Sequence, residues 1–220
     1  LFRSASPTLS IARLLPISPT TAATKGTVHL LADGGHIRVD GRIKANSTNG
    51  TAGGDIVIGR DEVTGVLAKT TDVSNAKLES NKGFVETSGD WLATDGVSVK
   101  ASEWLLDPSD ITISSATSSN VTGTSPADIT PDGGAGTSSI VQVSTIQNSI
   151  NVGTNVTIKT TNSSNATGAG NIIIADKLTF TNTGATDATL SLIADNGITQ
   201  NAGAAITTTT ASSQASLSLL

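Results

Sequence analysis

The chain has no cysteine, no methionine and no tyrosine, and only two tryptophans and three phenylalanines among 220 residues. Without cysteine, disulfide bonds, zinc–thiolate sites and thiol nucleophiles are excluded. Without methionine there is no initiator residue, and we expect an internal piece of a longer protein. Because aromatic residues make up 2% of the chain, its core has to be built from small aliphatic side chains.

Basic residues are also scarce. The net charge of −5 comes without the clusters of lysine and arginine that a nucleic-acid surface requires. No run approaches 18 apolar residues, so we expect no membrane span in this fragment. The only histidines, His29 and His36, give no metal-ligand spacing. We therefore expect no nucleic-acid partner, no metal and no cofactor.

Threonine, serine, asparagine, glycine and alanine fill the chain instead. Threonine, valine and isoleucine favour strands, whereas asparagine, glycine, aspartate and serine favour turns. Ile37, Val39 and Ile43 alternate with charged residues, which predicts one half-buried strand. Further short β-prone runs begin near residues 56, 85, 155, 171, 177, 188, 197, 205 and 215.

These runs recur at intervals of roughly 20 to 30 residues, which is typical of a structural repeat. A β-sandwich and a parallel β-helix both fit many short strands. Uniform strand length and small core residues favour the second. The expected fold is all-β, a right-handed parallel β-helix (a solenoid) with extra-helical loops.

The domain organisation follows from composition. Residues 1–25 are an unassigned upstream segment or linker, and residues 26–114 are β-helix coils, with an outward polar loop at 60–82. Residues 115–139 are a Ser/Thr/Gly/Pro-rich loop or linker. Residues 140–220 are further coils, expected to be truncated at the C-terminal end, and Ile146 and Ile150 at i, i+4 predict one short helical turn.

Both tryptophans lie in residues 83–113, which contain GFVETSG (83–89) and EWLLDPSDITI (103–113). We expect Trp104 to bury its ring at the end of one coil, with Leu105 and Leu106 beside it. Asp107-Pro108 should end that strand, because proline lacks a donor and restricts the residue before it. Trp91 is expected to cover a neighbouring edge or, alternatively, to stack on sugar rings.

In their order and spacing, these two motifs resemble a segment of filamentous-haemagglutinin-like exoproteins of two-partner secretion, most closely the high-molecular-weight adhesin type. Lys82 stands where that family usually has a second glycine. The resemblance extends more loosely to the strands before and after. The Asn-Pro-Asn motifs of the family's export domain do not occur, so the resemblance implies a downstream shaft segment.

The resemblance further implies a secreted or cell-surface protein that mediates attachment, aggregation or biofilm matrix contacts. Its implied partners are a dedicated outer-membrane export pore, host or bacterial surface glycans or proteins, and copies of itself. Two alternatives stay open. One is a self-assembling extracellular fibre subunit, joined through unpaired strand edges.

The other alternative is a β-helical polysaccharide-degrading enzyme with carboxylates on adjacent coils, for which Asp40 and Asp55 are candidates. The simpler interpretation is that these acidic residues mark strand ends, and we expect no catalytic residues and no enzymatic activity. Six Asn-x-Ser/Thr sequons occur, as chance predicts in so Asn-, Ser- and Thr-rich a chain. Because some high-molecular-weight adhesins carry sugars at such positions, the resemblance makes them candidate N-glycosylation sites: Asn46, Asn49, Asn120, Asn155, Asn162 and Asn165.

Overall fold

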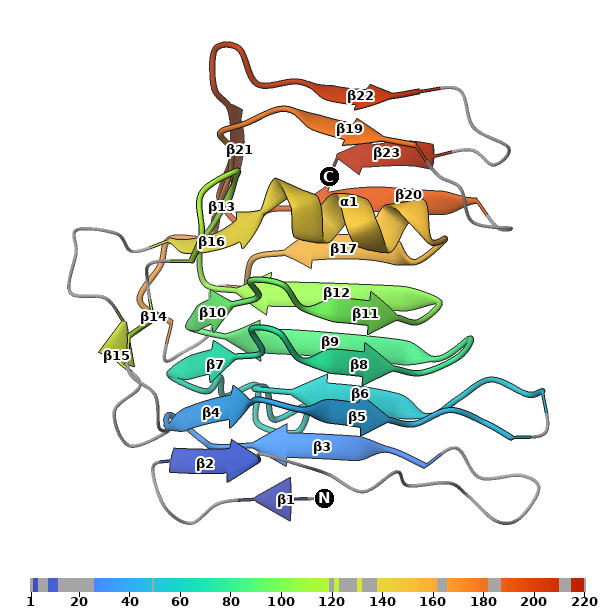
Figure 1. The fold of residues 1–220 in the computed structure, drawn as a ribbon. Coiled ribbons are helices and arrows are strands. Elements are labelled where there is room, and N and C mark those ends of the chain that lie inside the picture. The colour runs from blue at the N-terminus through green and yellow to red at the C-terminus, as the bar shows by residue number, and fades with distance from the viewer. Residues whose placement is uncertain are drawn as a thin grey trace.

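Short runs of β-branched residues broken by glycine, asparagine and aspartate form short strands throughout this chain. The computed structural model describes residues 2–3, 8–11, 26–48, 50–118, 121–122, 130–131, 138–161, 166–181, 187–209 and 215–219. Within them almost every regular element is a strand, apart from one helix (Figure 1). The fold is all-β and is dominated by parallel sheets.

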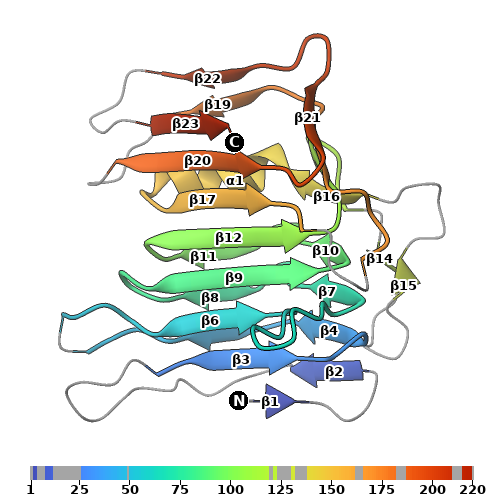
Figure 2. The ribbon, with the colours of Figure 1, turned by 180° about the vertical axis from the view of Figure 1, so that it is seen from behind.

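The largest sheet has eight strands and runs through the whole stack, as the view from behind shows (Figure 2). We call it sheet A. Every pairing in it is parallel. Its strands, in order, are β1 (Phe2–Arg3), β3 (Val28–Leu31), β6 (Asp55–Ile58), β9 (Phe84–Gly89), β12 (Glu103–Pro108), β17 (Asn155–Lys159), β20 (Ala188–Ile193) and β23 (Ala215–Leu219).

After a strand of sheet A, the chain enters one of two four-stranded parallel sheets. Sheet B1 contains β2 (Thr8–Ile11), β4 (His36–Val39), β7 (Thr70–Asp72) and β10 (Trp91–Ala93). Sheet B2, in order, contains β16 (Ser139–Gln142), β13 (Ile111–Ser114), β18 (Asn171–Ile174) and β21 (Gly197–Gln200). β1 and β2 lie in the segment 1–25, to which the sequence assigned no structure.

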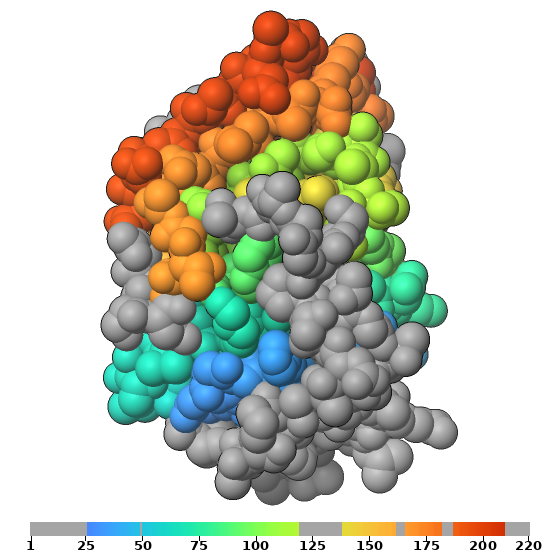
Figure 3. All heavy atoms as spheres, turned by 90° about the vertical axis from the view of Figure 1, so that its left-hand side faces the viewer, coloured from blue at the N-terminus to red at the C-terminus, as the bar shows by residue number. Residues whose placement is uncertain are grey.

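Two smaller parallel sheets complete the stack. Sheet C1 contains β5 (Arg42–Lys44), β8 (Lys77–Glu79) and β11 (Ser98–Lys100), and sheet C2 contains β19 (Leu178–Phe180) and β22 (Ile206–Thr208). The chain visits A, B and C strands in turn and then returns to sheet A beside the strand it left, as from β3 through β4 and β5 to β6. We call one such round a layer. On the face shown in Figure 3, successive layers follow one another from the blue end to the red end.

The alternation at residues 36–43 belongs to two strands, so the prediction of one strand was wrong. The chain bends at Asp40 and Gly41, where it leaves sheet B1 for sheet C1. Ile37, Val39 and Ile43 are nevertheless all buried. The alternation between core and solvent continues across the bend, and a period-two pattern therefore does not reveal where one sheet ends.

The segment 60–82, expected to be an outward polar loop, lies only partly outside the stack. β7 and β8 lie within it, and only the stretch before β7 leaves the stack, in a loop closed by a bridge between Arg60 and Leu67. Thr70, Thr71 and Asp72 form β7 and are buried although they are polar. Polar composition therefore misidentified a buried strand as a loop.

The segment 115–139 contains a small antiparallel pair, β14 (Val121–Thr122) and β15 (Thr130–Pro131); the rest of the expected linker lies largely outside the described residues. The chain then returns as β16, which pairs with β13. Helix α1 (Val143–Asn151) follows and packs against both β11 and β19, taking the C position of its layer (Figure 1). Ile146 and Ile150 are fully buried, and the helix is longer than the single turn expected.

Matching positions in sheet A form a column through the core. Each member is paired in register with the next, and the column runs through Val28, Ile56, Val85, Trp104, Val156 and Leu190. All are buried. Trp104 is thus the one large ring in a column of aliphatic side chains, which explains how so aromatic-poor a chain uses a tryptophan.

Candidate functional site: a buried polar corner

Polar side chains gather where the chain bends from sheet A to the B sheets. The bend follows β6, β9, β12 and β17 in successive layers. We call this group the polar corner. Its members form hydrogen bonds across layers, except Glu86, which accepts one from Ser88 of its own strand and lies near the charge of Arg60. The members are Arg60, Lys69, Glu86, Asp90, Asp107, Ser109, Asp110, Thr161 and Thr167.

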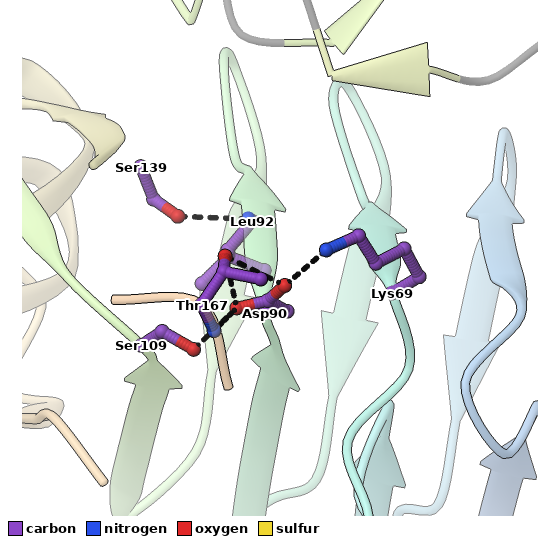
Figure 4. A network of polar contacts seen from close by, with 6 residues as sticks. All are labelled: Lys69, Asp90, Leu92, Ser109, Ser139 and Thr167. Atoms are coloured by element: carbon purple, nitrogen blue, oxygen red, sulfur yellow. Dashed lines mark hydrogen bonds and ion pairs between the residues drawn. The ribbon is translucent and has the colours of Figure 1, made fainter. Parts of the chain in front are cut away.

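Asp90 is the centre of the corner and is fully buried (Figure 4). Its carboxylate accepts hydrogen bonds from Lys69 Nζ at 2.5 Å, from Ser109 Oγ at 2.6 Å and from Thr167 N at 2.7 Å. Burial by itself would raise the pKa of Asp90, but these hydrogen bonds outweigh it and hold the pKa below its usual value. One charged carboxylate therefore ties together four segments of the chain.

Asp110 has a similar role in the next layer. Its carboxylate accepts hydrogen bonds from Ala169 N at 3.0 Å and from Asn171 N at 2.6 Å. A β-carbon at Gly168 would lie 2.6 Å from the same carboxylate, so only glycine leaves room for it. Asp110 thereby satisfies backbone donors of the segment that leads into β18.

Asp107 and Glu86 point to the outer side of sheet A beside Arg60. Asp107 is fully buried, and its Oδ2 accepts hydrogen bonds from Arg60 at 2.5 Å and from Thr161 Oγ1 at 2.9 Å. Burial raises the pKa of Asp107 despite these two donors. Burial also raises the pKa of Glu86, and the negative charges of Asp107 and Glu62 add to the effect.

This arrangement suits a structural role better than it suits the hydrolysis of a glycosidic bond. A glycosidase needs two carboxyl groups that a sugar can reach, whereas Asp107 is 0% and Glu86 is 5% exposed. Asp40 lies in the bend between β4 and β5 and Asp55 begins β6, so the two candidate catalytic residues belong to different bends. Within the described ranges, no three histidine or acidic side chains form a group that could hold a metal ion.

The residues of the tryptophan motif lie on both faces of β12. Trp104 is fully buried and its Nε1 donates to Thr87 Oγ1 at 3.0 Å. Leu106 shares the core, but Leu105 points to the other face of the strand and is half-buried. β12 includes Pro108 and ends there. Trp91 is 8% exposed, which leaves its ring too covered to stack on a sugar.

Two of the six sequons fall within the described residues. Asn46 Oδ1 accepts a hydrogen bond from Asn81 N, and Asn155 Oδ1 accepts one from Thr189 N. Asn155 begins β17 and is exposed. N-glycosylation stays a prediction at both positions; the other four sequons, Asn49, Asn120, Asn162 and Asn165, lie outside the described residues.

No pattern in the sequence singled out Asp90, Asp110 or Thr167 as a site. A signal was present, since Gly89-Asp90 and Ser109-Asp110 each follow the end of an expected strand. Equivalent strand ends lie side by side in stacked layers. Two acidic residues at such ends indicate a shared polar bend, but nothing in the sequence named Lys69 or Thr167 as their partners.

We expect Asp90→Asn to lower the free energy of unfolding at pH 7 by about 2 kcal/mol, because hydrogen bonds to a charged group are lost. A carboxyl group whose pKa is lowered by folding stabilises the protein above its unfolded pKa. That contribution disappears as the pH falls through the folded pKa. The difference between wild type and variant should therefore shrink below about pH 4, as measured by urea unfolding across the pH range.

Glu86→Gln is the matched control, because folding raises the pKa of Glu86. A raised pKa favours the neutral carboxyl, so the wild type loses stability as the pH rises through that value. Because glutamine is neutral at every pH, the stability of Glu86→Gln relative to the wild type should increase as the pH rises. Parallel pH profiles for the two variants would contradict the assignment of opposite shifts.

The described residues of the chain contain no helix that is both long and apolar enough to cross a membrane. No family model, curated protein or solved structure matches the chain.

Proposed function

We propose that this chain is a right-handed parallel β-helix and forms a structural shaft segment of a large secreted or cell-surface bacterial adhesin. The observation that carries the proposal is sheet A, whose eight strands pair in parallel from β1 to β23. Each inner strand forms backbone hydrogen bonds to both neighbours, so the ladder is continuous along the stack. Such a stack is stiff along its length and presents its bends and loops to the outside.

The polar corner supports a mechanical role. Asp90 is bonded to Lys69, 21 residues before it, and to Thr167, 77 residues after it. These bonds cross several layers and resist sliding of one layer over another. They add to the backbone ladder at a bend, where strand pairing is interrupted.

Ladders of like side chains on the outer faces support the same role. Thr179 and Thr207 share a hydrogen bond of 3.0 Å between their hydroxyl groups across β19 and β22. At sheet B2, Asn196, which directly precedes β21, donates from its Nδ2 to Asn171 Oδ1 of β18 at 2.8 Å. Stacked threonine and asparagine side chains stabilise parallel in-register layers.

Electron microscopy of native material, together with a denaturing gel, tests the proposal. We expect thin rods formed by a single long polypeptide, since layers stack about 4.8 Å apart. Rods that separate on the gel into many short copies of one chain would favour a self-assembling fibre subunit instead. Compact particles of one long chain would contradict a shaft.

A further inference from the structure

We propose that sheet C1 and helix α1 form a binding site for an acidic oligosaccharide. The site is a groove lined by Ser98, Lys100, Asn148 and Val152, extended past Lys82 and bordered by Lys77. We call it the basic groove. It lies on the side that faces the viewer in Figure 1, where α1 separates sheet C1 from sheet C2.

Positive charge is concentrated on the outer face of sheet C1. Arg42, Lys44, Lys77 and Lys100 alternate there with buried core residues, and Lys82 follows in the next turn. Arg42 is bonded to Glu79 at 2.6 Å. The four lysines form no ion pair with any described residue, although the chain as a whole carries a charge of −5.

Part of this arrangement works against stability. Glu79 lies opposite Lys44 and Lys100 in the register of sheet C1, and it is held by Arg42. Lys77, however, lies directly opposite Arg42, and like charges at such positions are destabilising. Lys82 has a φ of 56°, in the left-handed region that costs a residue with a side chain about 1–2 kcal/mol. A cationic side chain retained at such a cost points to a role outside folding.

Solubility does not account for the charge, because sheet C2 does without it. The outward positions of β19 and β22 hold Thr179 and Thr207, which bond to each other. The two sheets occupy the same side of the stack, on either side of α1. The outward positions of the sheet C2 strands are therefore neutral, with Lys177 just before β19 as the nearest basic residue in the sequence, whereas those of sheet C1 are mainly basic.

Helix α1 creates the groove. Because a helix takes the place of a strand, β11 has no strand partner among the described residues on the edge that faces α1. A cavity of about 420 Å³ lies between β11 and the polar residues of α1. A second cavity, of about 250 Å³, adjoins it past Lys82, and the two share Lys100 and Val152. Their combined size is that of a site for a small oligosaccharide.

Apart from Glu79, whose charge is paired with Arg42, the lining matches the chemistry of an acidic sugar. Amide and hydroxyl groups such as those of Asn81, Asn148 and Ser98 can pair with sugar hydroxyls. Lys82 and Lys100 can pair with carboxylate or sulfate groups. Val152 is 53% exposed and offers an apolar contact to a pyranose face. No aromatic ring lines either cavity, and single-stranded nucleic acid relies on such rings for stacking.

This inference adds to the proposed function and does not rest on it. Rods in the microscope with no glycan binding would leave the shaft proposal intact and overturn this one. Glycan binding by a chain that forms no rods would support the binding site and contradict the shaft proposal.

Calorimetric titration with a chondroitin sulfate octasaccharide tests the site, with neutral malto-octaose as the reference ligand. We expect binding of the acidic glycan only. Lys100→Gln should weaken it about tenfold, because a hydrogen bond to a charged group is lost. Lys177→Gln removes the same charge from an exposed position outside the groove and should change affinity less than twofold.

Asn148→Phe tests the open space of the groove without changing its charge. Asn148 is exposed on α1, so the variant should fold with an unchanged melting temperature while its ring fills the groove and abolishes glycan binding. Equal losses for Lys100→Gln and Lys177→Gln, or unimpaired binding by Asn148→Phe, would overturn the site. Tighter binding of an oligonucleotide of equal charge, lost in the same variants, would assign the surface to nucleic acid and overturn the glycan.

Discussion

Replacing Trp104 with alanine should lower the free energy of unfolding by about 3–5 kcal/mol, as expected for deleting a fully buried aromatic side chain. Trp104 is 0% exposed and stands between Val85 and Val156 in the sheet A column. Neither small neighbour can fill the space that an indole ring leaves. Urea unfolding followed by circular dichroism measures the loss.

A polar contribution adds to this cavity. Trp104 Nε1 donates to Thr87 Oγ1 at 3.0 Å inside the core. Without the indole, the buried Thr87 hydroxyl loses this donor, and an unsatisfied buried group costs about 1–3 kcal/mol. Trp104→Phe should therefore lose less than Trp104→Ala but remain measurably less stable than the wild type.

Leu105→Ala is the matched control within the same motif. Leu105 is the next residue of β12, but it is half-buried and points away from the core. We expect a loss of about 1 kcal/mol, in proportion to the smaller apolar area that it buries. Equal losses at Leu105 and Trp104 would mean that Trp104 does not anchor the core.

Gly54→Ala should be the second severe substitution, with a loss of at least about 3 kcal/mol or a failure to fold. A β-carbon at Gly54 would lie 1.5 Å from Gly26 O and 2.6 Å from Gly26 C. Both obstructing atoms belong to the backbone, so no side-chain rotation can relieve the overlap. The strand entries of adjacent layers would have to move apart.

The reason is a column of glycines at the entry to sheet A. Gly26, Gly54 and Gly83 precede β3, β6 and β9, and a β-carbon at Gly83 would in turn lie 2.6 Å from Gly54 O. At Gly54 and Gly83 the chain turns from sheet C1 back into sheet A, and the backbones of adjacent layers approach closely there. Gly35, which looks similar in the sequence, precedes β4 of sheet B1 and does not belong to this column.

Gly197→Ala controls for the general effect of a methyl group on a strand glycine. The nearest atom that its β-carbon would meet is Asn171 Oδ1, at 4.0 Å. We expect a change within about 0.5 kcal/mol. Thermal unfolding of both variants, with soluble yield recorded, decides between close backbone packing and a nonspecific effect.

Alternation located the strands of the second half well. β17, β18, β19, β20, β21, β22 and β23 coincide with the β-prone runs of the sequence. Strands such as β17, β19, β20 and β23 are short, their apolar residues alternate with threonine or serine, and turn residues bound them. The prediction was wrong at residues 36–43, because the alternation continues across the bend at Asp40 and Gly41. It was also wrong at residues 60–82, because the buried strand β7 is polar and shows no alternation of apolar and polar residues.

Composition and periodicity by themselves determined that the chain is all-β, that its core is made of small aliphatic residues, and that Trp104 is exceptional within it. Only the tertiary structure decided which polar residues are buried. Asp90 looks like any acidic residue in a turn, and its environment is created by Lys69 and Thr167, which stacking brings to it from other layers. The same stacking placed α1 where a strand would otherwise lie and so opened the groove beside Lys100. Local sequence specifies the strand, whereas contacts between layers join residues far apart in the chain, and no local pattern encodes them.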